Sequence, residues 1–393
     1  MKELVEVTRK IKKKRREGRS SRRKSTTSVP PDIISEILSK LPLKSLMRFR
    51  CVSKLWSSVS TDPYFKKSFQ AQSSERVSHI LVVGFRESDG FFVLSLPQQN
   101  LQNRIHSNGS YSCSQPIDSY RMEHAKHRCP FTIETESVHG LMICFQKPNK
   151  PIVWNPSLRK LTPLSKPGKT WKSIRVFLGY DPIEGKHKVV CMPKLIYGQA
   201  LDECKVLTLG SGSAQEQWRK VETIPDHFPL TGDNNGFYHA RCINGVVYYH
   251  AKGDYHRVIM SFDVRSEKFR AIRLPLETKS WRMTLSYHGK LACVGFGGHG
   301  RILLMIVLED ARKPKWSSHQ FSSLPDGATD DGELIFVGTE SLDMIYIDPK
   351  RKTFRRIDYS HILDDFRQRN GLGDWPSALK GFQFFHTETL VSL

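Results

Sequence analysis

Hydrophobic residues follow two different periods along the chain. Between residues 31 and 60 they recur at intervals of three and four residues, the period of an amphipathic helix. From residue 79 onward they form runs of four to eight residues, rich in Val, Ile, Phe and Tyr and separated by Gly, Pro, Asp, Asn and Ser. Such runs are typical of short antiparallel strands joined by turns. The sequence therefore predicts a mainly β protein with a small helical unit at its N-terminal end.

Three short helices are expected in the first region. Pro31 can open the first helix, because its missing N–H would have no partner there, and Asp32 is favourable in the first turn. Pro42 ends this helix and can start the second, and Ser53 is a candidate N-cap for the third. The Asp62-Pro63 step is expected to end the unit. The apolar residues of the first helix share one face: Ile33, Ile34, Ile37, Leu38 and Leu41.

A unit of about forty residues is too small to bury a sufficient core by itself. Part of its apolar surface should therefore be covered by another protein or by the rest of the chain. Residues 29–65 resemble the F-box of plant F-box proteins, with some twenty positions matching at fixed spacing. The departures are mild: Val29, Ile33 and Lys40 replace the usual Leu, Leu and Arg. The matching runs are Pro-Pro-Asp-Ile-Ile-Ser-Glu-Ile-Leu at 30–38, Leu-Pro-Leu-Lys-Ser-Leu at 41–46 and Arg-Phe-Arg-Cys-Val-Ser-Lys at 48–54.

This resemblance implies a helical head that binds the Skp-type adaptor of a cullin-based ubiquitin ligase. An interface of this kind has a desolvated apolar centre, where aliphatic and aromatic residues contribute most of the binding energy. Ile34, Phe49 and Leu55 are expected to pack inside the head instead. By their position in the motif, the adaptor-binding residues are expected to be Pro31, Ile33, Ile37, Leu38, Leu41, Pro42, Leu46, Val52 and Trp56.

The β region contains a repeated pattern. An Asn or Asp is followed six residues later by a large apolar residue, and the Asx is expected to end a strand and hydrogen-bond its own backbone in the turn. A fifth unit keeps the aromatic residue, Trp218, but has Gly212 in place of the Asx. An Asn-Gly or His-Gly step also precedes an apolar strand at 139–140, 244–245 and 288–289. The four complete pairs are Asn155/Leu161, Asp263/Phe269, Asp310/Trp316 and Asp348/Phe354.

The spacing of these repeats favours a β-propeller. The apolar positions 161, 218, 269, 316 and 354 are 57, 51, 47 and 38 residues apart, close to the length of kelch-like blades. A four-stranded repeat cannot cover both faces of its sheet unless neighbours stack on it, and radial stacking leaves few exposed edges. The aromatic residues that recur at the repeat positions, Trp218, Phe269, Trp316 and Phe354, are expected to pack between blades. About six blades are expected, the last one shared by residues 79–99 and 383–393. A pair of elongated β-sandwiches is the alternative.

Most of residues 79–360 resemble the F-box-associated interaction domain of plant F-box proteins. The resemblance implies a module that binds the target protein. Irregular segments at 100–130, 226–240 and 325–333 are candidate binding loops, because propellers usually bind through loops on one face. The motifs that carry the resemblance lie at 137–145, 153–164, 177–182, 243–248 and 259–264.

Positive charge is concentrated at the N-terminal end of the sequence. The formal net charge is +22, and residues 1–26 hold twelve Lys/Arg against three Glu. Self-repulsion and the lack of apolar residues predict a disordered tail over 1–27, either a nuclear localisation signal or a solvated arm. The remaining positive charge is spread over the rest of the chain. A basic protein of this kind also fits a nucleic-acid-binding or chromatin-associated role, the main alternative function.

The other features point to an intracellular protein without an active site. Eight cysteines are scattered singly, which suits a reducing compartment, and no secretory signal or apolar run of membrane-spanning length is present. Gly295, Gly297 and Gly300 match Gly-x-Gly-x-x-Gly but lie between two apolar runs, so a hairpin loop is expected rather than a dinucleotide site. The spacing of Cys113, His124, His127 and Cys129 fits no common zinc finger.

The hypothesis from the sequence is a non-enzymatic substrate-recognition subunit of an SCF-type ubiquitin ligase, without cofactor or metal. Its expected partners are a Skp-type adaptor, through it a cullin, and a target protein, in the nucleus or cytoplasm. An F-box protein acting outside a ligase remains a third possibility. The expected domains are the tail at 1–27, the F-box at 28–70, a linker at 71–78 and the β domain at 79–393.

Overall fold

The computed structural model divides the chain into two compact units, Met1–Ser68 and Phe69–Leu393. The predicted basic tail and nearly all of the predicted linker lie outside the residues that the structure describes. These described residues are 29–72, 79–86, 90–97, 109–112, 118–122, 132–194, 203–210, 217–224, 227–230, 240–252, 257–275, 278–297, 302–329, 331–338, 343–370 and 379–391.

The first unit is helical, as predicted, and its helices begin at the predicted residues. Pro31 is the first residue of its helix, and Pro42 directly precedes the next one. The side chain of Ser53 accepts a hydrogen bond from the Trp56 N–H over 3.1 Å, which confirms it as an N-cap. The helices are α2 (Pro31–Ser39), α3 (Leu43–Phe49), α4 (Lys54–Thr61) and α5 (Pro63–Ala71), which begins in this unit.

The expectation of three helices was wrong, because the Asp62-Pro63 step begins α5 instead of ending the unit. Asp62 Oδ1 accepts the N–H groups of Tyr64 (2.8 Å) and Phe65 (3.0 Å). An Asp cap followed by Pro is a helix start, because the carboxylate satisfies two N–H groups and Pro has none to lose.

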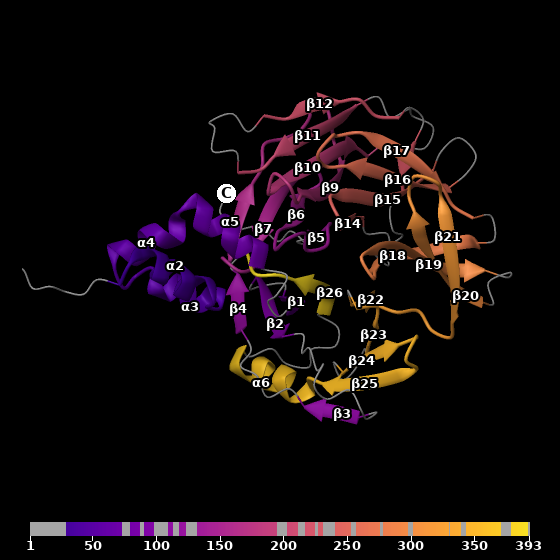
Figure 1. Ribbon diagram of the computed structural model, residues 1–393. Coiled ribbons are helices and arrows are strands. Elements are labelled where there is room, and N and C mark those ends of the chain that lie inside the picture. The colour runs from indigo at the N-terminus through magenta and orange to yellow at the C-terminus, as the bar shows by residue number, and fades with distance from the viewer. Residues whose placement is uncertain are drawn as a thin grey trace, which may run out of the picture. The chain divides into compact units, whose positions relative to one another are not determined.

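The second unit is a β-propeller, with its sheets arranged around a ring (Figure 1). The described strands form six sheets, numbered here as blades. Blade 1 is β5 (Thr132–Ile133), β6 (Met142–Lys147), β7 (Lys150–Asn155) and β8 (Lys160–Pro163); blade 2 is β9 (Ile174–Asp181), β10 (Lys186–Pro193), β11 (Cys204–Thr208) and β12 (Arg219–Val221). Blade 3 is β13 (Phe228–Pro229), β14 (Arg241–Ile243), β15 (Val246–Lys252), β16 (Arg257–Asp263) and β17 (Phe269–Arg273).

Blade 4 is β18 (Thr278–Tyr287), β19 (Lys290–Gly297), β20 (Ile302–Asp310) and β21 (Lys315–Phe321). Blade 5 is β22 (Gly327–Ala328), β23 (Leu334–Val337), β24 (Asp343–Asp348), β25 (Thr353–Asp358) and β3 (Gly109–Ser112). Blade 6 is β26 (Leu379–His386), β1 (His79–Arg86), β2 (Gly90–Pro97) and β4 (Asp118–Met122). The propeller rules out the alternative of paired β-sandwiches.

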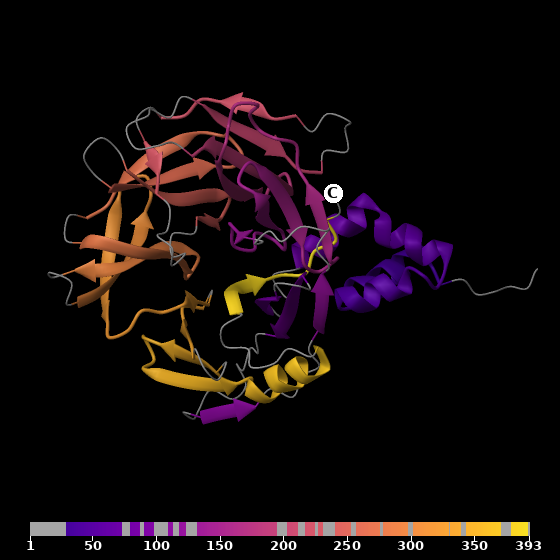
Figure 2. The same ribbon diagram turned by 180° about the vertical axis from the view of Figure 1, so that it is seen from behind.

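Both ends of the β region share blade 6, as the sequence suggested. β26 pairs with β1 in antiparallel register, with His79 opposite His386 and Leu81 opposite Gln383. The last strand of the chain thus lies beside the first one of the ring (Figure 2). One helix of this unit, α6 (Ser360–Asn370), precedes β26.

Segment 100–130, expected to be irregular, contains two strands. β4 continues blade 6, whereas β3 leaves it and pairs with the outer edge of blade 5. The β3–β25 pairing is parallel, from Arg355 opposite Gly109 to Asp358 opposite Ser112. Because β3 belongs to the connection between β2 and β4 of blade 6, its pairing with β25 links blade 6 to blade 5.

The repeated Asx residues form the turns that the sequence predicts. Asn155 Oδ1 accepts the Leu158 N–H (3.0 Å), and Asp263 Oδ1 accepts the Ser266 N–H (2.7 Å). The fourth residue after the Asx takes a left-handed conformation in three of these turns, which places one extra residue before the return strand. These residues are Arg159 (φ 54°), Glu267 (φ 59°) and Lys352 (φ 54°).

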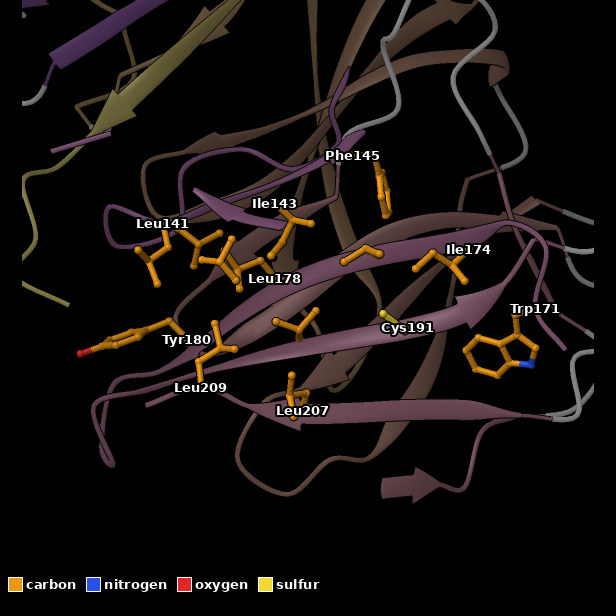
Figure 3. Close-up of a cluster of buried hydrophobic side chains, with 14 residues drawn as sticks. Leu141, Ile143, Phe145, Trp171, Ile174, Leu178, Tyr180, Cys191, Leu207 and Leu209 are labelled. Carbon is orange, nitrogen blue, oxygen red and sulfur yellow. The ribbon is translucent and has the colours of Figure 1, made fainter. Parts of the chain in front are cut away.

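Apolar side chains fill the space between neighbouring blades. In the cluster of Figure 3, Ile143 on β6 faces Leu178 on β9, and Cys191 and Leu207 continue it on β10 and β11. Sheets that are covered on both faces need such near-continuous apolar strands. Burial of this kind contributes most of the stability of a domain.

The repeated aromatic residues do not all pack between blades as expected. Trp218 and Trp316 are partly buried against the inter-blade clusters, and their indole N–H groups donate to Ser165 O (2.9 Å) and Arg273 O (3.2 Å) of the preceding blade. Phe269 also packs against a cluster. Phe354 is 49% exposed, so the prediction fails for this residue.

Polar contacts hold the C-terminal segment in the ring. The buried His386 ring lies 3.0 Å from both Ser137 Oγ and Ser157 Oγ. Asn155, which forms the blade 1 turn through Oδ1, also donates through Nδ2 to Thr389 O (3.3 Å) and Val391 O (2.8 Å). Residues after β26 are therefore bound to blade 1 and complete the closure.

Gly140 provides a test of this closure. It has a φ of +84°, and a Cβ there would lie 2.5 Å from both Thr387 O and Thr389 Cγ2. Gly289 has a similar φ of +67° but open space around the added atom. We expect Gly140→Ala to lower the free energy of unfolding by roughly 3 kcal/mol or more, and Gly289→Ala by about 1 kcal/mol from backbone strain alone. Chemical denaturation of the two variants measures the difference. Equal losses would show that the C-terminal segment does not press on Gly140.

A second test uses pH. Burial lowers the pKa of His386 to about 3, and lowers that of His139 to about 4. In the unfolded chain these groups bind a proton below about pH 6.5, which the folded state excludes until near pH 4 at His139 and near pH 3 at His386. Stability is therefore complete above pH 6.5 and falls as the pH decreases toward 4, by up to about 1.4 kcal/mol per pH unit for each such histidine. His386→Gln should reduce this slope, whereas His319→Gln, at an exposed position on β21, should preserve it.

Candidate adaptor-docking surface

Helix α2 carries two apolar stripes rather than one. Ile34 and Leu38 are each 1% exposed, whereas Ile33 and Ile37 are 48% and 44% exposed. Each pair is four residues apart, so its members lie above one another on the helix, and the two pairs are about 100° apart. One stripe is thus buried, and the second faces solvent.

Exposed apolar side chains are concentrated in the helical unit. Of the nine large apolar residues that are exposed in the described part of the chain, six lie between residues 29 and 64. Single exposed apolar residues are normal on a protein surface, but a concentration within so short a segment marks an interaction surface. The six are Val29, Ile33, Ile37, Val52, Leu55 and Tyr64.

Most of the predicted adaptor-binding residues are accessible. Leu41 and Trp56 are half-buried, and five others are exposed: Pro31, Ile33, Ile37, Pro42 and Val52. Leu38 and Leu46, with 1% and 0% exposure, are buried and offer no surface to a partner. Their assignment to the interface needs correction, because the apolar period of a short helix does not reveal which of two stripes is buried.

The predicted interior of the unit is correct in part. Ile34 is buried, and the Phe49 ring packs on Trp56 with a centroid distance of 5.0 Å. Leu55 is 39% exposed, contrary to expectation. Ser60 is buried instead at 1% exposure, with its hydroxyl donating to Ser57 O (2.9 Å). Because this hydroxyl forms its hydrogen bond within its own helix, Ser60 can be buried although a hydrophobicity pattern does not predict it.

Family comparisons match both units of the chain. A model of the F-box domain matches residues 27–68, and a model of the F-box associated beta propeller domain matches residues 80–385. The chain belongs to the plant F-box proteins. The Arabidopsis thaliana chain At1g47730 is 47% identical to it, with 100% of both chains covered. F-box protein At1g48060 of the same species is 44% identical, with 93% of each chain covered.

Exposed cations surround the apolar surface of this F-box. Lys44, Arg48 and Lys54 are exposed on α3 and α4. On α2, Lys40 Nζ lies 2.8 Å from Glu36 Oε1, and this hydrogen bond holds the pKa of the Glu36 carboxyl below its usual value. Charges around an apolar centre set specificity and association rate more than affinity, so an acidic rim is expected on the partner.

The other motifs give no competing site. β19 and β20 pair in antiparallel register, with Gly297 opposite Ile302, so the glycine motif does lead from one strand to the next. Gly295 and Gly297 lie on β19 rather than in the expected loop, and Gly300 lies outside the described residues. The Cys/His group at 113–129 lies outside the described residues, as do most of the candidate loops 100–130 and 226–240. Within the described part of the chain, no helix has the length and apolar character needed to cross a membrane.

The two stripes of α2 predict opposite effects for neighbouring substitutions. Leu38→Asp should unfold the F-box helices, because it places a carboxylate in an apolar interior. Ile37→Asp should leave them folded, because that side chain already contacts water. Hydrogen exchange of residues 31–49 in the full-length protein measures this, and we expect loss of protection in Leu38→Asp alone. Similar protection in both variants would contradict the assignment of the stripes.

Proposed function

We propose that this protein is the substrate-recognition subunit of an SCF-type ubiquitin ligase. The observation that carries the proposal is an F-box whose α2 helix keeps a solvent-exposed stripe of Ile33 and Ile37 beside a filled interior. Other apolar side chains, such as Ile34 and Leu38, fill the interior of the helical unit, and Ile33 and Ile37 lie outside it. A Skp-type adaptor, and through it a cullin, is the partner expected to cover them.

The docking surface that we propose combines α2 with the region where α3 meets α4. Each fully buried aliphatic side chain contributes about 1.5–3 kcal/mol, so a few of them suffice for stable association. Leu55 is exposed three residues after Val52, and we add it to the surface that the motif alone would assign. The proposed contact residues are Pro31, Ile33, Ile37, Leu41, Pro42, Val52, Leu55 and Trp56.

The propeller is proposed to hold the target protein. Its rigid sheets carry turns whose side chains vary from blade to blade, a common way to build a binding surface. In this role the chain performs no chemistry. It brings the target close to the ubiquitin-loaded enzyme of the complex, and such positioning converts a slow bimolecular reaction into an effectively unimolecular one.

Adaptor binding tests the proposal directly. In the full-length protein, Ile33→Asp with Ile37→Asp should weaken binding of a purified Skp-type adaptor by about a hundred-fold or more, because two apolar contacts become buried charges. Leu41→Asp with Trp56→Ala should abolish it. Ile183→Asp is the matched control, since Ile183 is an exposed aliphatic residue of the propeller at 62% exposure.

Calorimetry gives the dissociation constants, and circular dichroism confirms that each variant is folded. Undiminished binding by the Ile33/Ile37 variant would contradict the proposed docking surface. If the unsubstituted protein failed to bind any Skp-type adaptor, the ligase function itself would be wrong.

The formal charge of +22 supports one second candidate, binding to nucleic acid. The dependence of binding on salt concentration distinguishes nucleic-acid binding from adaptor binding. Phosphate binding weakens steeply as ionic strength rises, whereas apolar docking on an adaptor changes little. Tight, salt-sensitive binding to DNA or RNA together with absent adaptor binding would favour this candidate.

A further inference from the structure

Four outer turns of the propeller carry a concentration of positive charge. These turns join the third and fourth strands of their blades and begin at the repeated Asx residues: 155–160 in blade 1, 263–268 in blade 3, 310–315 in blade 4 and 348–353 in blade 5. They contain ten Lys/Arg against four Asp/Glu. All ten cationic residues are exposed: Arg159, Lys160, Arg265, Lys268, Arg312, Lys313, Lys315, Lys350, Arg351 and Lys352.

These basic turns lie on one face of the propeller. Strand direction alternates within a blade. Each blade therefore has another turn at the same end as its outer turn. This inner turn joins the second strand to the strand or bridge before it. The inner turns of successive blades touch: the His139 ring stacks on Tyr180 (3.8 Å between centroids), and Asn244 Nδ2 donates to Gly289 O (3.1 Å). This row of inner turns continues where a Cβ on Gly245 would meet Pro182.

Blades 3, 4 and 5 also contact one another on this face. Arg270 on β17 donates to Arg312 O over 2.6 Å, which joins blade 3 to the blade 4 turn. The inner turn of blade 5 touches that of blade 4, because a Cβ on Gly332 would meet the His288 ring. The basic turns of blades 3, 4 and 5 therefore lie on neighbouring blades of one face.

The aspartates in these turns are engaged by their own backbone. Asp310 Oδ1 accepts the Arg312 N–H over 2.7 Å, and Asp348 Oδ1 accepts the N–H groups of Lys350 and Arg351 over 2.9 Å each. The neighbouring lysine ammonium groups extend into solvent on long side chains, where an incoming anion can reach them.

We propose that this basic-turn face binds an acidic segment of the target protein. The inference rests on the proposed function, which requires a target, and it names the chemistry by which that target is recognised. Aspartate, glutamate or phosphorylated side chains of an extended segment would pair with cations of blades 3, 4 and 5. A polypeptide fits better than nucleic acid, because turn carboxylates lie between the cations and would repel a continuous phosphate backbone.

The experiment compares two triple variants of the full-length protein. The basic-turn variant carries Lys313→Glu, Lys315→Glu and Lys350→Glu. The control variant carries Lys166→Glu, Lys169→Glu and Lys172→Glu, exposed lysines in the connection from β8 to β9 at the opposite end of the strands. Both variants change the net charge equally, so a difference between them reports the position of the charges. Thermal unfolding confirms that each variant folds.

The probes are a fluorescent Glu-rich peptide, its Gln counterpart and a single-stranded oligonucleotide of the same net charge as the Glu peptide. We expect the Glu peptide to bind the parent protein, the Gln peptide not to bind, and the basic-turn variant to lose roughly ten-fold or more in affinity for the Glu peptide. The control variant should change that affinity by no more than about two-fold.

Equal weakening in both variants, or no binding of the Glu peptide to the parent, would overturn the proposal. Tighter binding of the oligonucleotide than of the Glu peptide would overturn it in favour of nucleic acid. Adaptor binding is measured in the same samples. Its absence in the parent would remove the ligase function, while position-dependent Glu-peptide binding would still establish the acidic-segment surface.

Discussion

Ring closure is the constraint on which the propeller depends. Apolar clusters fill the junctions between neighbouring blades, and a gap at one junction would expose its cluster to water. Antiparallel pairing of β26 with β1 closes the ring by joining residues more than 290 positions apart. Closing so long a loop costs conformational entropy, and contacts beyond this one pair of strands are needed to offset it. The hydrogen bonds of His386 and Asn155 with blade 1 and the C-terminal segment supply further attachment.

One local rule produces both the repeated fold and its charged surface. In each Asx turn a carboxylate or amide oxygen satisfies backbone N–H groups, and three of the turns place their fifth residue in the left-handed region. The cationic side chains of these turns are exposed, so Lys and Arg are tolerated there at almost no cost. The turns can therefore vary in charge while the strands that they connect stay fixed. Selection on a binding surface can act there without altering the core.

The sequence predicts the strands of this protein well and its interfaces less well. The runs at 79–85, 91–96 and 302–308 are all strands, because an uninterrupted apolar run with flanking turn residues has few alternatives. The Asx turns follow from chemistry between neighbouring residues and were equally predictable. Leu38, Leu55 and Phe354 were misplaced for a different reason. Their burial depends on which neighbouring element covers them, and an apolar residue has the same local pattern on either side of a helix or strand.

The same distinction explains what the sequence shows of the candidate sites. The F-box surface was found through a motif of fixed spacing, but the motif includes interior residues such as Leu46 along with exposed ones, and only burial separates them. For the basic-turn face, the repeated Asx marks each turn, but no motif shows that the turns share one face. Its cations lie up to about 200 positions apart in four segments and reach one face only because every blade repeats the same alternation of strand direction. Net charge alone attributes them to a general affinity for polyanions. Their position on consecutive turns, between carboxylates already bound to the backbone, instead favours recognition of discrete acidic side chains.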